Sequence, residues 1–231
     1  MDLEIRPIDA AEWQRFCRTM AVAYGPGDDD GEDADLAPHV EYDRTLAAFD
    51  GDQIVATAGA FSLQLTLPGL ARVPAAGLGF VAVLPSYRRR GILGALMRRH
   101  FDDAEARGEP VSVLYASEAG IYGRFGYGAA SHYVEYELDP RRAGFQAAGQ
   151  GSGRVRLVEG AEALRLLPEV HDRHRRRQPG DVARFPWLWE LLVRDPKWLR
   201  EFDGPTFFAV HEAEPGSVDG YVIWRVQPRW S

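Results

Sequence analysis

The apolar and polar residues of this chain fall into short periodic segments separated by glycine and proline turns. Residues 3–8 alternate between apolar and polar side chains, as a half-buried strand does. Residues 10–23 place apolar side chains three to four positions apart, which predicts an amphipathic helix, and Asp9 is suited to cap its first turn. Apolar runs between turn signals predict further strands at 44–50, 53–67 and 73–84.

Residues 79–97 combine a strand, a basic turn and a helix. Residues 80–84 are all apolar, which is typical of a strand covered on both faces, and Pro85 ends it. From Gly91 on, apolar side chains recur at helical spacing, so three consecutive arginines stand at the start of a helix. Free N–H groups and the positive dipole end favour an anion there, and a glycine lets a phosphate approach the backbone closely. The alternative is an ordinary strand-to-helix junction with solvated arginines.

The elements after this stretch suggest two domains. The pattern predicts a helix to residue 107, a strand at 111–115, a helix at 117–125 and a strand at 131–138. Residues 139–154 are rich in glycine and mark a boundary. Beyond them the order strand, helix, strands begins again and stops before a helix like the one at Gly91. We expect an α/β fold with a mixed sheet in residues 1–140, a linker at 141–154 and an incomplete second domain at 155–231.

Composition and charge narrow the classes of function. The net charge of −7 argues against nucleic acid as a general partner and accommodates a cationic substrate. The single cysteine, Cys17, excludes an intrachain disulfide and lies in a helical pattern, so we expect a packed core thiol in a reducing, cytoplasmic setting. No apolar run is long enough to span a membrane, and the acidic N-terminus lacks the basic region of a signal peptide.

Four further patterns are possible sites. The glycine pattern at 77–82 leads into a strand rather than a helix, so a dinucleotide site is rejected. His171 and His174 lack a third ligand nearby, so no metal is expected. The basic cluster at 173–177 leaves a weak nucleic-acid hypothesis. The acidic loop at 25–35 is either a solvated loop or a lid that attracts a polyamine-like substrate.

Two longer motifs carry the functional hypothesis. They are FVAVLPSYRRRGILG at 80–94 and ASEAGIYGRFGYG at 116–128. In an α/β sheet the carboxyl ends of adjacent parallel strands face one crevice, so Tyr122 would lie beside a ligand bound at the basic turn. In this order the motifs resemble the GCN5-related N-acetyltransferase (GNAT) superfamily, and more closely its enhanced intracellular survival (Eis) subfamily. The superfamily signature R/Q-x-x-G-x-G/A is met at Arg88 and Gly91, with Leu93 at its last position and Gly94 one place later.

The resemblance implies a GNAT fold, acetyl-CoA as donor, no metal, and direct attack of an amine on the thioester. It assigns the pantetheine arm to the backbone of Val81, Ala82 and Val83, and the pyrophosphate to Arg89, Arg90, Gly91, Ile92, Leu93 and Gly94. Ser117 and Glu118 would complete the donor site. Tyr122 would be the general acid that protonates the departing thiolate. For the acceptor, the sequence adds an anionic loop with Asp28 and an apolar wall at Phe80.

The resemblance also implies a primary amine as acceptor (an aminoglycoside, a polyamine or a lysine side chain) and a hexamer. Family chains are nearly twice as long, and their base is a C-terminal carboxylate delivered by a domain that resembles a sterol carrier protein. We therefore expect a fragment in which Ser231 does not take that role. Glu118 and His132 are substitute bases, each more readily explained as structural or donor-side. The alternative is a catalytically silent acyl-CoA-binding or assembly module.

Overall fold

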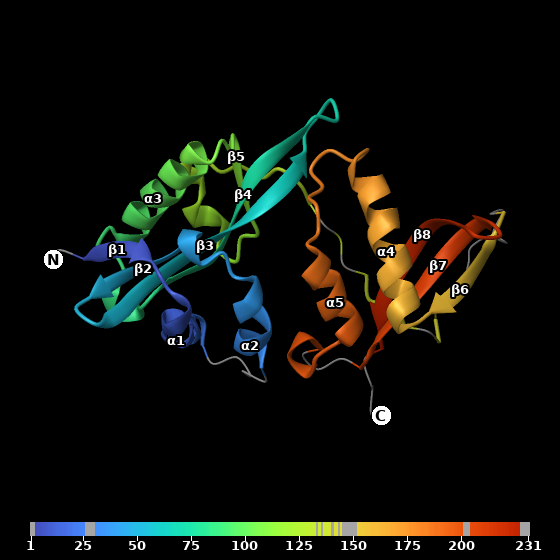
Figure 1. Cartoon of the computed structure of the whole chain (residues 1–231), viewed down its shortest axis with the longest axis horizontal. Coiled ribbons are helices and arrows are strands. Elements are labelled where there is room, and N and C mark those ends of the chain that lie inside the picture. The colour runs from blue at the N-terminus through green and yellow to red at the C-terminus, as the bar shows by residue number, and fades with distance from the viewer. Residues whose placement is uncertain are drawn as a thin grey trace.

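The computed structural model describes residues 3–25, 31–132, 134, 136–139, 141–142, 144, 152–200 and 204–226. Within them the chain forms two sheets, with α4 and α5 lying between them (Figure 1). The first sheet has the order β1 (Glu4–Pro7), β2 (Thr45–Asp50), β3 (Gln53–Thr66), β4 (Arg72–Val83), β5 (Val111–Leu114). Its first four strands are antiparallel and β5 is parallel to β4, so the predicted mixed α/β fold is confirmed.

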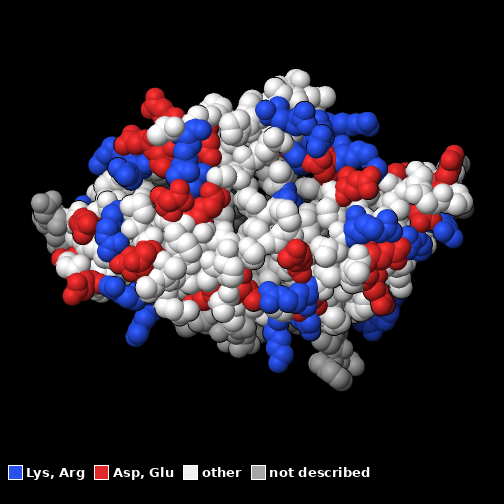
Figure 2. Space-filling model, in the orientation of Figure 1, with Lys and Arg blue, Asp and Glu red and all other residues white. Residues whose placement is uncertain are grey.

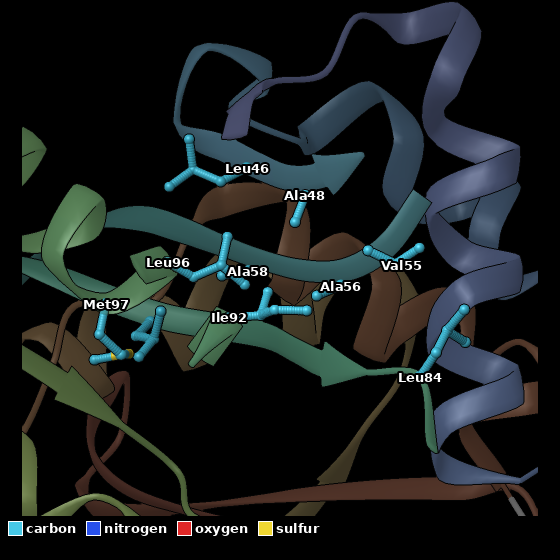
Figure 3. Packing of buried hydrophobic residues seen from close by; sticks show 10 residues of the cluster. Leu46, Ala48, Val55, Ala56, Ala58, Leu84, Ile92, Leu96 and Met97 are labelled. Atoms are coloured by element: carbon cyan, nitrogen blue, oxygen red, sulfur yellow. The ribbon is translucent and has the colours of Figure 1, made fainter. Parts of the chain in front are cut away.

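Two helices cover opposite faces of this first sheet. The helices are α1 (Trp13–Tyr24) and α3 (Ile92–Ala106). Because successive side chains of a strand point to opposite faces, β2 divides its residues between two cores. Leu46 and Ala48 pack with α3 residues such as Leu96, as Figure 3 shows, whereas Phe49 packs against α1. Cys17 is buried in the α1 core, as predicted.

The second sheet is antiparallel and carries its helices on one face. It contains β6 (Arg154–Val158), β7 (Thr206–Glu214) and β8 (Ser217–Arg225), packed against α4 (Gly160–Arg175) and α5 (Pro186–Arg194). Backbone hydrogen bonds join the segment after α4 to the first sheet: Gly180 N donates to Thr66 O (2.8 Å) and Ala183 N to Gln64 O (2.9 Å). This segment therefore continues the pairing of β3 at its far end.

Two predicted elements are wrong. Residues 117–125 form two 3-10 turns, Ala119–Ile121 and Gly123–Phe125, and not an α-helix. Closely spaced glycines lower the helical propensity of this segment, which the apolar spacing did not reveal. The described residues of 131–138 lie in no strand, and the side chain of Tyr136 is 80% exposed. Alternation alone does not make a strand without a pairing partner.

A bulge in β4 opens the edge of the first sheet. Phe80 has φ of 56° within the strand, and the register between β3 and β4 shifts between Thr57 and Gly59. Thr57 Oγ1 donates to Phe80 O (2.7 Å), and a Cβ on Gly59 would lie 2.7 Å from the Phe80 ring. β4 pairs with β5 only as far as Leu78. Beyond it the two strands separate, so residues 80–83 lack a strand partner on the β5 side. Their faces stay covered as the apolar run predicts, since Val81 and Val83 pack in the α3 core and Phe80 in the α1 core.

A buried ion pair links β2 to the segment after α3. The Arg44 guanidinium donates to both oxygens of Glu109 (2.9 and 2.6 Å), and both side chains are buried. Replacing Arg44 with Met leaves the Glu109 carboxylate buried without its partner, so we expect the free energy of unfolding to fall by roughly 3–5 kcal/mol. Urea denaturation measures it. Arg141→Met, at an exposed ion pair, should change it by less than about 1 kcal/mol, and equal losses would contradict the prediction.

Candidate functional site

The separation of β4 and β5 forms a cleft of 1050 Å³, as large as a small-molecule site. It runs from the start of α3 along the free part of β4 to the segment after β5. Its lining is mostly apolar, with polar groups at its two ends. The lining residues are Ala23, Tyr24, Leu78, Gly79, Phe80, Val81, Ala82, Val83, Tyr87, Arg88, Arg89, Gly91, Ile92, Leu93, Gly94, Leu114, Tyr115, Ser117, Glu118, Ile121, Tyr122, Arg124 and Phe125.

Twelve of the residues predicted from the sequence line this cleft. They are Phe80, Val81, Ala82, Val83, Arg89, Gly91, Ile92, Leu93, Gly94, Ser117, Glu118 and Tyr122. Arg90 does not line it, because its guanidinium lies over the Tyr87 ring, 4.9 Å from the centroid. Asp28 lies outside the described residues. The two motifs, separated by a helix and a strand in the sequence, therefore meet in one cavity.

The basic turn presents the free end of α3 to the cleft. Gly91 is the N-cap, with φ of 79°, and the bond from Ala95 N to Gly91 O (3.1 Å) closes the first helical turn. The N–H groups of the three residues between them therefore precede the helical ladder. A Cβ on Gly91 would meet no atom within 4 Å, so the space above this end is open. These features suit the diphosphate of a nucleotide-like group.

The first arginine of the turn has a structural role that the sequence did not reveal. Arg88 Nε donates to Val83 O (3.3 Å) and its Nη2 to Ala23 O (3.2 Å). Arg88 thus joins the end of β4 to the end of α1, whereas Arg89 lines the cleft without such a bond among the described residues. The local sequence cannot separate these roles, because the partners lie on other elements.

Tyr24 is a cleft residue that the sequence pattern did not identify. It is the last residue of α1, and its hydroxyl donates a short hydrogen bond to Val81 O. This carbonyl belongs to the free part of β4, where the resemblance predicts pairing with a ligand. Burial raises the pKa of the Tyr24 hydroxyl, so it is protonated at neutral pH. The helical pattern places Tyr24 at the end of a helix but gives no sign of the strand it contacts.

Tyr122 also lines the cleft and lies between the two 3-10 turns. Burial, and to a lesser extent the nearby Tyr24, raises the pKa of the Tyr122 hydroxyl. The phenol is therefore protonated at neutral pH and can donate a proton. Glu118 is a carboxylate in the same cavity, whereas His132 is exposed and does not line it.

Part of the predicted acidic lid is an anchored helix. α2 (Glu32–Leu36) carries Asp35, which pairs with Arg194 (2.8 Å) and accepts from Trp198 Nε1 (2.8 Å). These two partners lower the pKa of Asp35. The described end of the acidic loop is thus fixed to the segment around α5, so this part does not form a solvated loop.

The basic cluster at the end of α4 is partly neutralised. Basic side chains gather over the upper end of this helix in Figure 2. Asp172 pairs with Arg175 and with Arg176, at 2.6 Å in each case.

In the described part of the chain no group of three or more metal-ligating side chains occurs, and none of its helices is long and apolar enough to cross a bilayer.

Comparison with known proteins relates this cavity to an enzyme family. A family model described as an acetyltransferase (GNAT) domain matches residues 4–130. The chain is 38% identical over 232 residues to an uncharacterized N-acetyltransferase of Streptomyces avermitilis, covering 100% of this chain and 56% of that one. It is 39% identical over 180 residues to N-acetyltransferase Eis of Mycobacterium tuberculosis, covering 76% of this chain and 43% of that protein. The crystal structure of Eis1 from Mycobacterium abscessus superposes with a TM-score of 0.77 at 33% identity, over 97% of this chain and 54% of that chain. The chain thus spans about half the length of the curated relatives it matches.

Proposed function

The chain belongs to the GNAT acetyltransferase family, and from this premise we propose that it transfers acetyl from acetyl-CoA to a primary amine by direct attack. The observation that carries the proposal is the single cleft that joins the free end of α3, the part of β4 that no longer pairs with β5, and Tyr122. Such a cavity accommodates a long donor with an anionic end and a reactive end.

Each part of the cleft has a proposed task. The free N–H groups before Ala95, with Arg89, bind the diphosphate, and the backbone of residues 81–83, which has no strand partner on its β5 side, binds the amide-bearing arm. Ser117 and Glu118 complete the donor site, and Phe80 lines the acceptor side. The neutral amine attacks the thioester carbonyl carbon, so that a C–N bond forms and the C–S bond breaks. Tyr122 gives its proton to the departing thiolate, and the proton that the acylated nitrogen loses restores the phenol.

The attacking amine must lose a proton, since a free amine of pKa about 10 is mostly protonated at neutral pH. Glu118 is the carboxylate among the described residues of the cleft, which supports it as the local candidate for the base. An aminoglycoside, a polyamine or a lysine side chain all fit the proposed chemistry. Likeness to the Eis proteins also supports our proposals of a hexamer, a cytoplasmic location, and two domains at 1–140 and 155–231 joined by a linker.

Calorimetric titration with acetyl-CoA tests the donor, and thiol release with neomycin and with a lysine peptide tests the reaction. We expect binding and amine-dependent release of free thiol. Absence of binding would refute the proposal. Binding without release would favour the silent acyl-CoA-binding module instead.

The contact between Tyr24 and Val81 gives a further prediction. The Tyr24 hydroxyl takes one of the two acceptor positions of a carbonyl that we assign to the donor, so it competes with a donor group that binds there. Tyr24→Phe removes this competition and should tighten acetyl-CoA binding by about fivefold, since a net hydrogen bond contributes about 1 kcal/mol. Titration measures the change, and Tyr136→Phe, at an exposed tyrosine, is the control. Weaker binding in Tyr24→Phe would show that the hydroxyl assists the donor.

A further inference from the structure

A buried polar chain lies behind the Tyr122 ring. It joins α3, β5 and the segment after the second 3-10 turn. His100 Nε2 lies 2.8 Å from Ser112 Oγ, and Ser112 Oγ lies 2.5 Å from the Tyr127 hydroxyl. Ser112 Oγ also donates to Ala76 O on β4 (3.1 Å). His100 is 3% exposed, and Tyr127 packs against the α3 core.

One assignment of the protons allows all three of these hydrogen bonds to form at once. The Ala76 carbonyl can only accept, so the single Ser112 proton points to it. Ser112 Oγ must then accept from both Tyr127 O–H and His100 Nε2–H, which uses its two lone pairs. Burial, followed by the nearby Arg44, lowers the pKa of His100 to about 4, so the imidazole is neutral at pH 7. The Tyr127 hydroxyl is therefore held in one orientation.

The Tyr122 loop (residues 116–128) packs Tyr122, Phe125 and Tyr127 against the α3 core, and its hydrogen bonds to the sheet are few. Its backbone hydrogen bonds, such as Phe125 N to Tyr122 O (2.9 Å), stay within the loop. Among the described residues, one side chain of this loop is hydrogen-bonded to the sheet: Tyr127, to Ser112. The Tyr127 ring stands edge-on to the Tyr122 ring, with centroids 5.8 Å apart, and on its other side contacts Phe101 at 6.0 Å.

We propose that Tyr127, tethered through Ser112 to His100 and Ala76, is a positioning residue that fixes the Tyr122 hydroxyl for proton donation. The inference rests on the proposed function, in which Tyr122 is the acid. Tyr127 does not reach the reacting atoms. It acts through the ring contact. Because the Tyr127 hydroxyl is held by Ser112, the Tyr127 ring has a fixed position, and the Tyr122 ring packed against it is fixed in turn. A small displacement of such a group is enough to slow proton transfer.

The first test needs no turnover. Tyrosine labelled with ¹³C at Cζ gives one resonance for Tyr122, identified as the line missing from Tyr122→Phe. Tyr127→Phe keeps the ring and removes the tether, and Ser112→Ala removes it from the other side. We expect both to shift and broaden the Tyr122 resonance. Ser112→Thr keeps a hydroxyl, and Tyr136→Phe changes an exposed tyrosine, so both should leave the line in place. An unmoved Tyr122 line in Tyr127→Phe and Ser112→Ala overturns the inference.

The second test is kinetic. Tyr127→Phe should lower kcat about 10-fold and leave the KM for acetyl-CoA within about twofold. In the Tyr122→Phe background, Tyr127→Phe should have no further effect on kcat, because the group it positions is gone. If the two substitutions lower kcat by factors that multiply in the double variant, or if Tyr127→Phe no longer binds acetyl-CoA, Tyr127 has a general structural role and the inference is overturned. If Tyr122→Phe itself leaves the rate unchanged, the assigned acid fails, and the resonance test still decides whether Tyr127 positions Tyr122.

Discussion

Replacing Tyr122 with phenylalanine should lower kcat by about 10²–10³-fold, because general acid catalysis contributes 10²–10⁴-fold and other donors replace part of it. Tyr122 lines the cleft in which we propose that the donor binds, and the raised pKa of its hydroxyl keeps it protonated through the neutral range. Phenylalanine fills the same space and keeps the contact with the Tyr127 ring. The chemical step should suffer while the cleft stays intact. Thiol release under saturating acetyl-CoA and amine measures the loss.

The affinity of Tyr122→Phe for acetyl-CoA distinguishes a loss of catalysis from a folding defect. Acetyl-CoA affinity in Tyr122→Phe should stay within about twofold, since a group that acts in the transition state adds little to ground-state binding. Tyr136→Phe, a similar change on an exposed ring, should retain full activity. A Tyr122→Phe protein that turns over at the unmodified rate would remove Tyr122 from the mechanism.

Combining Arg89→Glu with Gly91→Asp should weaken acetyl-CoA binding by at least about 100-fold, because each change places a carboxylate where the diphosphate is proposed to lie. Gly91 also has φ of 79°, a conformation that aspartate adopts less readily than glycine. Both residues line the open end of α3, and the space above Gly91 is free of protein atoms within 4 Å. Calorimetric titration measures the affinity.

Arg99, in the middle of α3, and Gly108, just beyond its C-terminal end, offer a matched control. Arg99→Glu with Gly108→Asp makes the same chemical changes, and Gly108 also has a positive φ, with no atom within 4 Å of the place a Cβ would take. Neither residue lines the cleft. This double variant should bind acetyl-CoA within about twofold of the unmodified chain, since exposed charges far from a ligand are largely screened. Equal losses in both double variants would place the diphosphate elsewhere.

The cleft depends on irregular backbone in β4 and around Tyr122. The bulge at Phe80 stops the pairing of β4 with β5, and the two 3-10 turns replace the predicted helix around Tyr122. A regular strand and helix would close the cavity and turn Tyr122 differently. The donor end, by contrast, is an ordinary helix N-terminus, with a glycine cap that keeps the approach open.

Patterns in the sequence predict most of the elements of the first sheet, the helix at Gly91 and the two motifs of the cleft. These depend on local properties: apolar periodicity, glycine and proline positions, and the free N–H groups of a helix start. The buried Cys17 followed from the same periodicity.

Three features of the site follow from the folded chain alone. Arg88, Arg89 and Arg90 have different roles, Tyr24 contacts Val81, and Tyr127 is linked to Ser112 and His100. The tertiary structure also shows that residues 117–125 form no helix and that the described residues of 131–138 form no strand. The physical reason is the same in each case. These features depend on partners distant in the sequence, and a one-dimensional pattern reports the side chains of a segment but not the groups they meet.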